Sequence, residues 1–166
     1  MSLPRRSRTA AVTLAVLAAA AALAGPTARA QSGPPPGCTG PASSTWINVN
    51  VEGLRSSDGL LAITLYPDDP RRFLVRHGSL YVGRVPAHAG SMRACIFVPE
   101  PGNYVLALYH DENGNRKFDR SGLGLPAEGY GFSNNPPTIA GLPSFRAVRL
   151  SIPKANLSTR IQMKYP

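Results

Sequence analysis

Apolar and polar residues alternate along several short stretches of the chain, which is the pattern of half-buried β-strands. Near the start, Ile47, Val49 and Val51 alternate with polar residues, and near the end residues 157–165 alternate over their whole length. Further candidate strands lie between them, at residues 60–66, 79–85, 92–98 and 104–110. Residues 104–110 (YVLALYH) are apolar on both faces, which predicts the central strand of a sheet.

Two segments depart from simple alternation. Residues 145–152 are a candidate strand whose apolar phase slips between Ala147 and Val148, which predicts a β-bulge there. Residues 69–76 (DPRRFLVR) are the one candidate for a short helical turn, because Pro70 suits a first turn. About seven short strands separated by Gly and Pro turns predict one all-β domain, an antiparallel sandwich of the Ig-like or transthyretin-like kind.

One long segment, residues 120–143, has no periodicity and is rich in Gly, Pro and Asn. Connections of this length are uncommon in compact domains and usually carry function or pack over a specific surface. Its apolar residues, Tyr130 and Phe132 among them, are suited to hold it against the sandwich. We therefore expect one long ordered loop.

The N-terminus has the parts of an export signal. Three arginines within residues 5–8 precede an apolar run at residues 10–24, and Ala28-Arg29-Ala30 supplies the small-x-small cleavage pattern. The run is shorter than the ~20 residues that span a bilayer. We expect a periplasmic or secreted protein without a transmembrane anchor after cleavage, organised as a cleaved signal peptide (residues 1–30), a flexible Pro/Gly-rich leader (31–44) and a β-sandwich domain (45–166).

Cleavage of the signal changes the charge. The full chain has 18 Lys and Arg against 9 Asp and Glu, a formal net charge of +9, and four of the arginines lie in residues 1–30. The mature chain keeps 14 basic residues and a net charge of +5. Because these residues are scattered and we expect the protein to be exported, the charge favours solubility and argues against nucleic-acid binding. Weak attraction to an anionic membrane surface is the alternative.

Cys38 and Cys95 are the two cysteines of the chain. In an oxidising compartment an even count predicts one disulfide, which would tie the leader to the body of the domain. Two unrelated buried thiols are the alternative. The chain has no CxxC pattern, so neither redox chemistry nor a zinc site finds support.

The densest polar chemistry is HDENGNRKFD, residues 110–119. Asp111, Asn113, Asn115 and Asp119 fall at positions one, three, five and nine of an EF-hand-like loop, which points alternate side-chain oxygens at a Ca²⁺ ion. The sixth and twelfth positions, where that loop needs Gly and a bidentate Glu, are Arg and Gly. A true EF-hand is therefore excluded, and a weak Ca²⁺ site completed by Glu128 or by a loop carbonyl is the remaining metal hypothesis.

Two alternatives stand beside the calcium site. Asn113-Gly114 is a strong turn signal, so residues 104–112 and 115–119 are candidate arms of a hairpin whose Asp and Asn side chains cap backbone groups. A hydrolase-like centre would use His110, Asp111 and Glu128 as an acid–base group. We find no triad, nucleophile elbow or phosphate loop, and we assign no catalytic residue.

Several motifs occur in an order that resembles one family. They are GNYVLALYHDENGNRKFD, GLPAEGYGFSNN, PSFRAVRL and the closing IQMKY. Together they resemble the bacterial exported family called domain of unknown function 2141, over residues 46–165. The resemblance implies an exported β-sandwich, with no established activity and no assigned catalytic residues. A weaker similarity links PEPGNYVL to carboxypeptidase-regulatory and transthyretin-like sandwiches, which are mostly accessory modules.

We therefore expect a non-enzymatic module of the cell envelope whose partner, a small ligand, glycan or protein, the sequence does not identify. The expected ligand-binding residues are His110, Tyr130 and Asn134, beside the Ca²⁺ loop. The competing hypotheses are the hydrolase-like enzyme and a purely structural domain.

Overall fold

The structure is a computed structural model that describes residues 33–166. The predicted signal peptide lies outside these residues. The elements are β1 (Thr45–Leu54), β2 (Leu60–Pro67), β3 (Tyr81–Pro86), β4 (Gly90–Val98), β5 (Gly102–Asp111), β6 (Gly129–Phe132), α1 (Phe145–Val148), β7 (Arg149–Ile152) and β8 (Leu157–Gln162). The all-β fold class is confirmed, with eight strands where about seven were predicted. Among residues 33–166, no helix has the length and apolar character needed to cross a bilayer.

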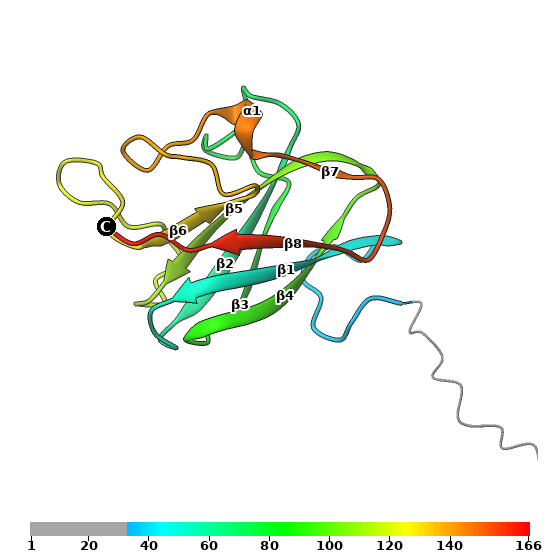
Figure 1. Ribbon diagram of the computed structural model, residues 1–166, viewed down its shortest axis with the longest axis horizontal. Helices are drawn as coiled ribbons and strands as arrows, with labels where there is room; N and C mark the ends of the chain where they lie inside the picture. The colour runs from blue at the N-terminus through cyan, green and yellow to red at the C-terminus, as the bar shows by residue number, and fades with distance from the viewer. Residues whose placement is uncertain (1–32) are drawn as a thin grey trace, which may run out of the picture. The chain divides into compact units, whose positions relative to one another are not determined.

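The strands form two sheets that pack face to face (Figure 1). The smaller has the order β4-β1-β8, and the larger has the order β3-β2-β5-β6 with β7 also paired to β5. Every pair of strands is antiparallel except β1 and β8. This pair departs from the purely antiparallel sandwich expected. It arises because the chain leaves the larger sheet after β7 and re-enters the smaller one alongside β1.

The central position of β5 explains why both its faces are apolar. Leu106 and Leu108 lie in the core between the sheets, while Val105 and Ala107 face a second apolar cluster on the outer face of the larger sheet. Phe73 and other side chains of the connections pack over that outer cluster. The sequence prediction of a central strand here is confirmed.

The segment at residues 145–152 differs from its prediction. Its first four residues form α1, and β7 begins only at Arg149. Phe145 and Val148, three residues apart on one helical face, both pack into the outer cluster. The phase slip therefore marks a helix–strand junction, and the bulge predicted there is wrong. A register shift occurs instead in β1 at Gly53, which has a φ of 79°.

Two other segments also differ. Residues 69–76 form hydrogen-bonded turns, and Leu74 has a φ of 55°, which a right-handed helix excludes. The hairpin partner of β5 is β6, while residues 115–119 form no strand. Because β6 lies in the middle of residues 120–143, the predicted long loop is two connections on either side of a short strand.

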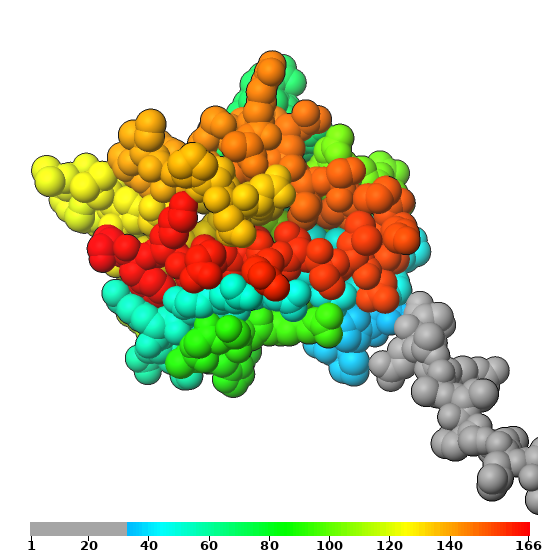
Figure 2. All heavy atoms as spheres, viewed as in Figure 1, coloured from blue at the N-terminus to red at the C-terminus, as the bar shows by residue number. Residues whose placement is uncertain are grey.

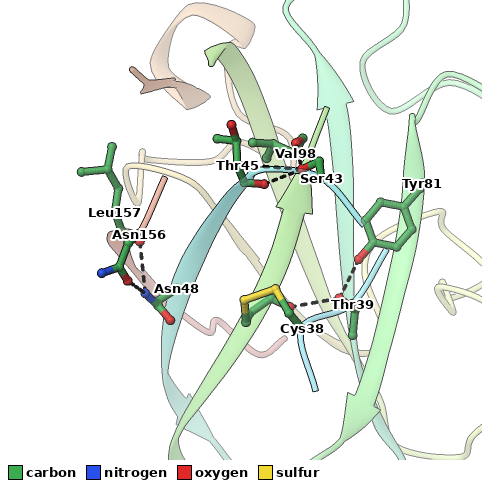
Figure 3. The surroundings of a disulfide bond; sticks show 10 residues. Cys38, Thr39, Ser43, Thr45, Asn48, Tyr81, Val98, Asn156 and Leu157 are labelled. Atoms are coloured by element: carbon green, nitrogen blue, oxygen red, sulfur yellow. Dashed lines mark hydrogen bonds between the residues drawn. A yellow bond between two sulfur atoms is a disulfide. The ribbon is translucent and has the colours of Figure 1, made fainter. Parts of the chain in front are cut away.

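The predicted disulfide between Cys38 and Cys95 is confirmed, with 4.4 Å between the Cα atoms (Figure 3). Beside it, Thr39 N donates to Cys95 O (2.9 Å), and Phe97 N donates to Thr39 O (2.9 Å). The Tyr81 hydroxyl donates to Thr39 Oγ1 (2.6 Å). Residues 38 and 39 of the predicted leader thus cover the free edge of β4 and reach β3 of the other sheet.

Candidate functional site

The end of β5 brings two acidic side chains together. The β5–β6 register pairs His110 with Gly129, so the next position places Asp111 opposite Glu128. Side chains alternate along a strand, so both carboxylates lie on the outer face of the larger sheet. Both are buried, with 0% of Asp111 and 5% of Glu128 exposed. Like charges in directly opposed positions repel each other, so this arrangement requires compensation.

The loop after Asp111 winds back around its carboxylate. Arg116 N donates to Asp111 Oδ2 (2.8 Å). Asn115 N donates to Asn113 Oδ1 (3.0 Å), and Lys117 N donates to Asn115 Oδ1 (2.8 Å). Arg116, at the sixth position, has a φ of 62° and so adopts the left-handed conformation that an EF-hand-like loop obtains from Gly. The sharp turn therefore forms despite the unfavourable residue.

Asp119 joins the loop to the strand. Its Oδ2 accepts hydrogen bonds from Asn113 Nδ2 and Asn115 Nδ2, both at 2.8 Å. Its backbone N–H donates to Glu128 Oε2 (3.0 Å). Four of the five residues predicted to hold Ca²⁺ are thus joined by hydrogen bonds, and the fifth, Asp111, is bound to the same loop through Arg116 N. The connection after β5, yellow in Figure 2, projects at one end of the domain near the C-terminal residues, which are red.

One oxygen of each buried carboxylate has no hydrogen-bond partner among the described residues. Asp111 Oδ1 and Glu128 Oε1 are buried and accept no hydrogen bond from any residue in the described range, 33–166. Burying a charged oxygen without a partner is costly, so such atoms are rare in folded proteins and call for an explanation. A cation between the two strands would provide one.

The electrostatics point the same way. Burial raises the pKa of Glu128, and repulsion from Asp119, Asp111 and Glu112 raises it further, against the lowering effect of the Asp119 N–H. At Glu112 the balance is reversed, because the hydrogen-bonded Arg55 guanidinium lowers its pKa. Negative charge is therefore compensated beside the loop and uncompensated inside it.

The donor set favours a hard cation over a transition metal. Within residues 33–166, no three His, Cys, Asp or Glu side chains converge to form a metal centre from those residue types alone. An ion here would need Asn and carbonyl oxygens beside the carboxylates, which Ca²⁺ accepts and structural Zn²⁺ does not. Asn113 and Asn115 each keep a second lone pair on Oδ1 for that purpose.

Both ring nitrogens of His110 have hydrogen-bond partners within the domain. Its ring is fully buried, with Nε2 2.9 Å from Asp58 O and Nδ1 2.7 Å from the Tyr165 hydroxyl. A carbonyl only accepts, so Nε2 donates to Asp58 O. Among the described hydrogen bonds, none joins His110 to Asp111 or Glu128. The geometry of the proposed acid–base group is therefore not formed.

The other two expected ligand residues differ from each other. The Asn134 amide donates to Ala147 O (3.2 Å) and Arg149 O (2.7 Å), so both of its hydrogens support the helix–strand junction. Tyr130 lines a cavity of about 200 Å³ on the outer face of the larger sheet. Sequence reasoning did not select Phe118 and Arg120, which also line it; their proximity to the Asp/Asn motif was the available signal.

The comparison with known families covers most of the sandwich. The model of the family described as "Uncharacterized protein conserved in bacteria (DUF2141)" matches residues 49–160, a range that contains all five predicted Ca²⁺ residues. No match to the chain was found among curated proteins or among solved structures. The resemblance seen in the sequence motifs is confirmed, and the chain belongs to this bacterial family, domain of unknown function 2141.

Proposed function

We propose that this domain is a non-enzymatic, Ca²⁺-binding β-sandwich module of the bacterial cell envelope that presents a ligand-binding surface beside its ion. The observation that carries the proposal is the pair of buried carboxylate oxygens, Asp111 Oδ1 and Glu128 Oε1, that accept no hydrogen bond within residues 33–166. They lie at the base of a loop whose hydrogen bonds follow an EF-hand-like turn.

The proposed ion takes its oxygens from both sides of the β5–β6 connection. Asp111 and Glu128 supply carboxylates from the strand ends, and the loop supplies Asn113 and Asn115. Asp119 supports the site from behind, because its Oδ2 accepts hydrogen bonds from both amides. A divalent cation relieves the repulsion that raises the Glu128 pKa. Arg116 and Lys117 bring positive charge close by, which favours a weak site in the range of roughly 10⁻⁴–10⁻³ M of extracellular modules.

The envelope location has separate support. The chain carries an intramolecular disulfide, and such bonds persist mainly outside the cytoplasm. The predicted signal peptide points to the same compartment. The non-enzymatic part of the proposal is supported by His110, whose two ring nitrogens both have hydrogen-bond partners other than Asp111 and Glu128.

Thermal unfolding of the exported protein in Ca²⁺ and in EDTA tests the proposal. At 10 mM Ca²⁺ and a Kd of about 10⁻⁴ M, binding stabilises the fold by about 2.7 kcal/mol. We expect the melting temperature to rise by roughly 5–10 °C in Ca²⁺. Asp111→Asn should abolish the rise, whereas Asp58→Asn, an exposed acid outside the loop, should keep it. An unchanged melting temperature would show that the loop is only a structural closure.

A further inference from the structure

The cavity on the outer face has a floor that the strands themselves create. In the middle of that face the outward residues of β2 and β5 are small, with Thr64 paired to Ala107. Large aromatic side chains surround this floor on three strands; those lining the cavity are Tyr66, Tyr109, Tyr130 and Phe132. Because Thr64 and Ala107 are small and the surrounding side chains are large, a hollow remains on this face of the sheet.

The connections wall the hollow without closing it. Phe118 and Arg120 come from the β5–β6 connection, Leu74 from the β2–β3 connection and Leu142 from the segment before α1. All seven exposed large hydrophobic side chains of the described residues lie on these connections, and Leu74 and Leu142 are among them. Two of the seven, Leu74 and Leu142, line the cavity itself, and exposed apolar side chains at an opening are typical of a contact surface.

The dimensions and chemistry of the cavity limit its ligand. Its volume of about 200 Å³ exceeds the roughly 150 Å³ of an apolar cavity that binds benzene, so a single ring fits. Aromatic walls favour an aromatic ring, through edge and offset contacts. A mostly apolar lining with a few polar groups, here Thr64 and the Tyr109 hydroxyl, is typical of small-molecule sites.

The charge of the walls is one-sided. Among the described residues that line the cavity, none is acidic, and Arg120 places its guanidinium 5.1 Å from the centre of the Phe118 ring. A second guanidinium borders it, because Arg84 Nη2 lies 3.4 Å from the Tyr109 hydroxyl. Arg84 Nε is buried and donates no hydrogen bond within residues 33–166. An anionic group on the ligand complements Arg120, which lines the cavity, while Arg84 lies outside the lining and donates to Arg116 O.

We infer that this cavity is a binding site for a single-ring aromatic carboxylate. The inference rests on the proposed function, because it assigns a ligand class to the same non-catalytic surface. The ring lies over Thr64 and Ala107 between the aromatic walls, and the carboxylate faces Arg120.

Residues that line the cavity are close neighbours of the residues proposed to surround the ion. Phe118 and Arg120 flank Asp119, while Tyr109 and Tyr130 stand two residues from Asp111 and Glu128 on the same face of β5 and β6. An ion that holds Asp119 against Glu128 therefore also fixes two walls of the cavity. Benzoate should accordingly bind more tightly in Ca²⁺ than in EDTA.

The test is titration of the exported protein with benzoate, once in Ca²⁺ and once in EDTA. Calorimetry measures the dissociation constant, and NMR measures the chemical-shift changes of the aromatic rings. Benzyl alcohol replaces the carboxylate by a neutral group, and cyclohexanecarboxylate replaces the aromatic ring. We expect saturable benzoate binding that shifts the signals of Tyr109, Phe118 and Tyr130, and weaker binding of both analogues.

Two variants locate the site. Arg120→Gln should weaken benzoate binding about tenfold and leave benzyl alcohol unchanged, because one charge-assisted contact is lost. Arg146→Gln, an exposed arginine that does not line the cavity, is the matched control and should bind like the wild type. Ala107→Leu fills the floor and should abolish binding of all three probes, provided that its melting temperature shows a folded protein.

The outcomes separate this inference from the proposed function. Absence of benzoate binding in both solutions, or binding that neither Arg120→Gln nor Ala107→Leu changes, overturns the inference even if Ca²⁺ raises the melting temperature. Benzoate binding that responds to both variants but not to Ca²⁺ supports the cavity and leaves the calcium site to the unfolding test.

Discussion

Two segments of this domain close opposite parts of the sandwich by different physical means. Residues 38 and 39 are fixed to β4 by a disulfide and by backbone hydrogen bonds. The Asp/Asn loop, residues 111–119, closes the ends of β5 and β6 through carboxylates and amides, and it leaves two buried oxygens without partners among residues 33–166. The first closure is complete within the chain. The second is not complete among the described residues.

The difference shows what each closure responds to. A disulfide constrains the unfolded chain and is indifferent to pH and to ions over ordinary ranges. Buried carboxylates respond to protons and cations, because either one removes their repulsion. Redox conditions should therefore control one closure, while pH and Ca²⁺ control the other.

The largest expected effect is loss of the disulfide. The bond joins two cysteines that are 57 residues apart in the sequence. The double variant Cys38→Ser, Cys95→Ser should therefore lower the free energy of unfolding by about 4 kcal/mol. Denaturant unfolding measures it, and reduction of the wild-type protein should reproduce the loss. If the two closures are independent, the Ca²⁺-dependent rise in melting temperature survives in the reduced protein. A loss below about 1 kcal/mol would show that the hydrogen bonds of Thr39 suffice without the covalent bond.

Glu128→Gln should have effects of opposite sign in the two solutions. In Ca²⁺ it removes a charged ligand and should cost most of the roughly 2–3 kcal/mol gained from the ion. In EDTA it should be neutral or stabilising, because the amide relieves repulsion and can donate to Asp111 Oδ1. Melting temperatures in both solutions decide the matter. Equal destabilisation in both would mean that Glu128 is an ordinary packing residue.

The pH dependence of the ion-free protein should be smaller but diagnostic. The pKa of Glu128 is raised in the folded state, so its stabilising effect is present below its unfolded pKa and is lost as pH rises through the folded value. In EDTA, the wild type should gain stability relative to Glu128→Gln as pH falls toward the unfolded Glu pKa of about 4.3. Glu112 has a lowered pKa and so favours its ionised form in both proteins. A constant difference in melting temperature would contradict the raised pKa.

Arg116→Gly should have the smallest effect. A left-handed residue other than Gly costs roughly 1–2 kcal/mol, and the greater freedom of Gly in the unfolded chain offsets part of that gain. We expect a net stabilisation of about 0.5 kcal/mol and tighter Ca²⁺ binding, since a positive charge leaves the loop. Arg116→Ala keeps the backbone strain and is the control for charge alone. If both variants gain equally in stability, charge and not conformation is responsible.

Much of the fold was predictable because alternation and burial act locally. The strands around Val49, Ile63 and Leu106 follow directly from their apolar positions. The helical turn at residues 145–148 was not, because four residues satisfy both a helical and a strand-like pattern. The same limit applies to residues 69–76, where local helical signals yield to packing of Phe73 against the outer sheet face.

The candidate site also has a part that the sequence predicts and a part that it does not. The loop spacing pointed to Asp111, Asn113 and Asn115, because Asx side chains at intervals of two act on their own backbone. The opposition of Asp111 and Glu128 depends on the β5–β6 register, which sequence spacing alone does not give. The cavity was hidden for a similar reason, since it needs Thr64 and Ala107 to be neighbours on paired strands.

The parallel pairing of β1 with β8 bears on how the chain is made. The first strand of the domain stays a sheet edge until the last strand arrives, because residues 47–52 pair with residues 157–162. A chain that stops before residue 157 leaves that edge free to pair with another molecule. Copies truncated before β8 should therefore aggregate or be degraded, so that only chains synthesised through residue 162 persist as folded monomers.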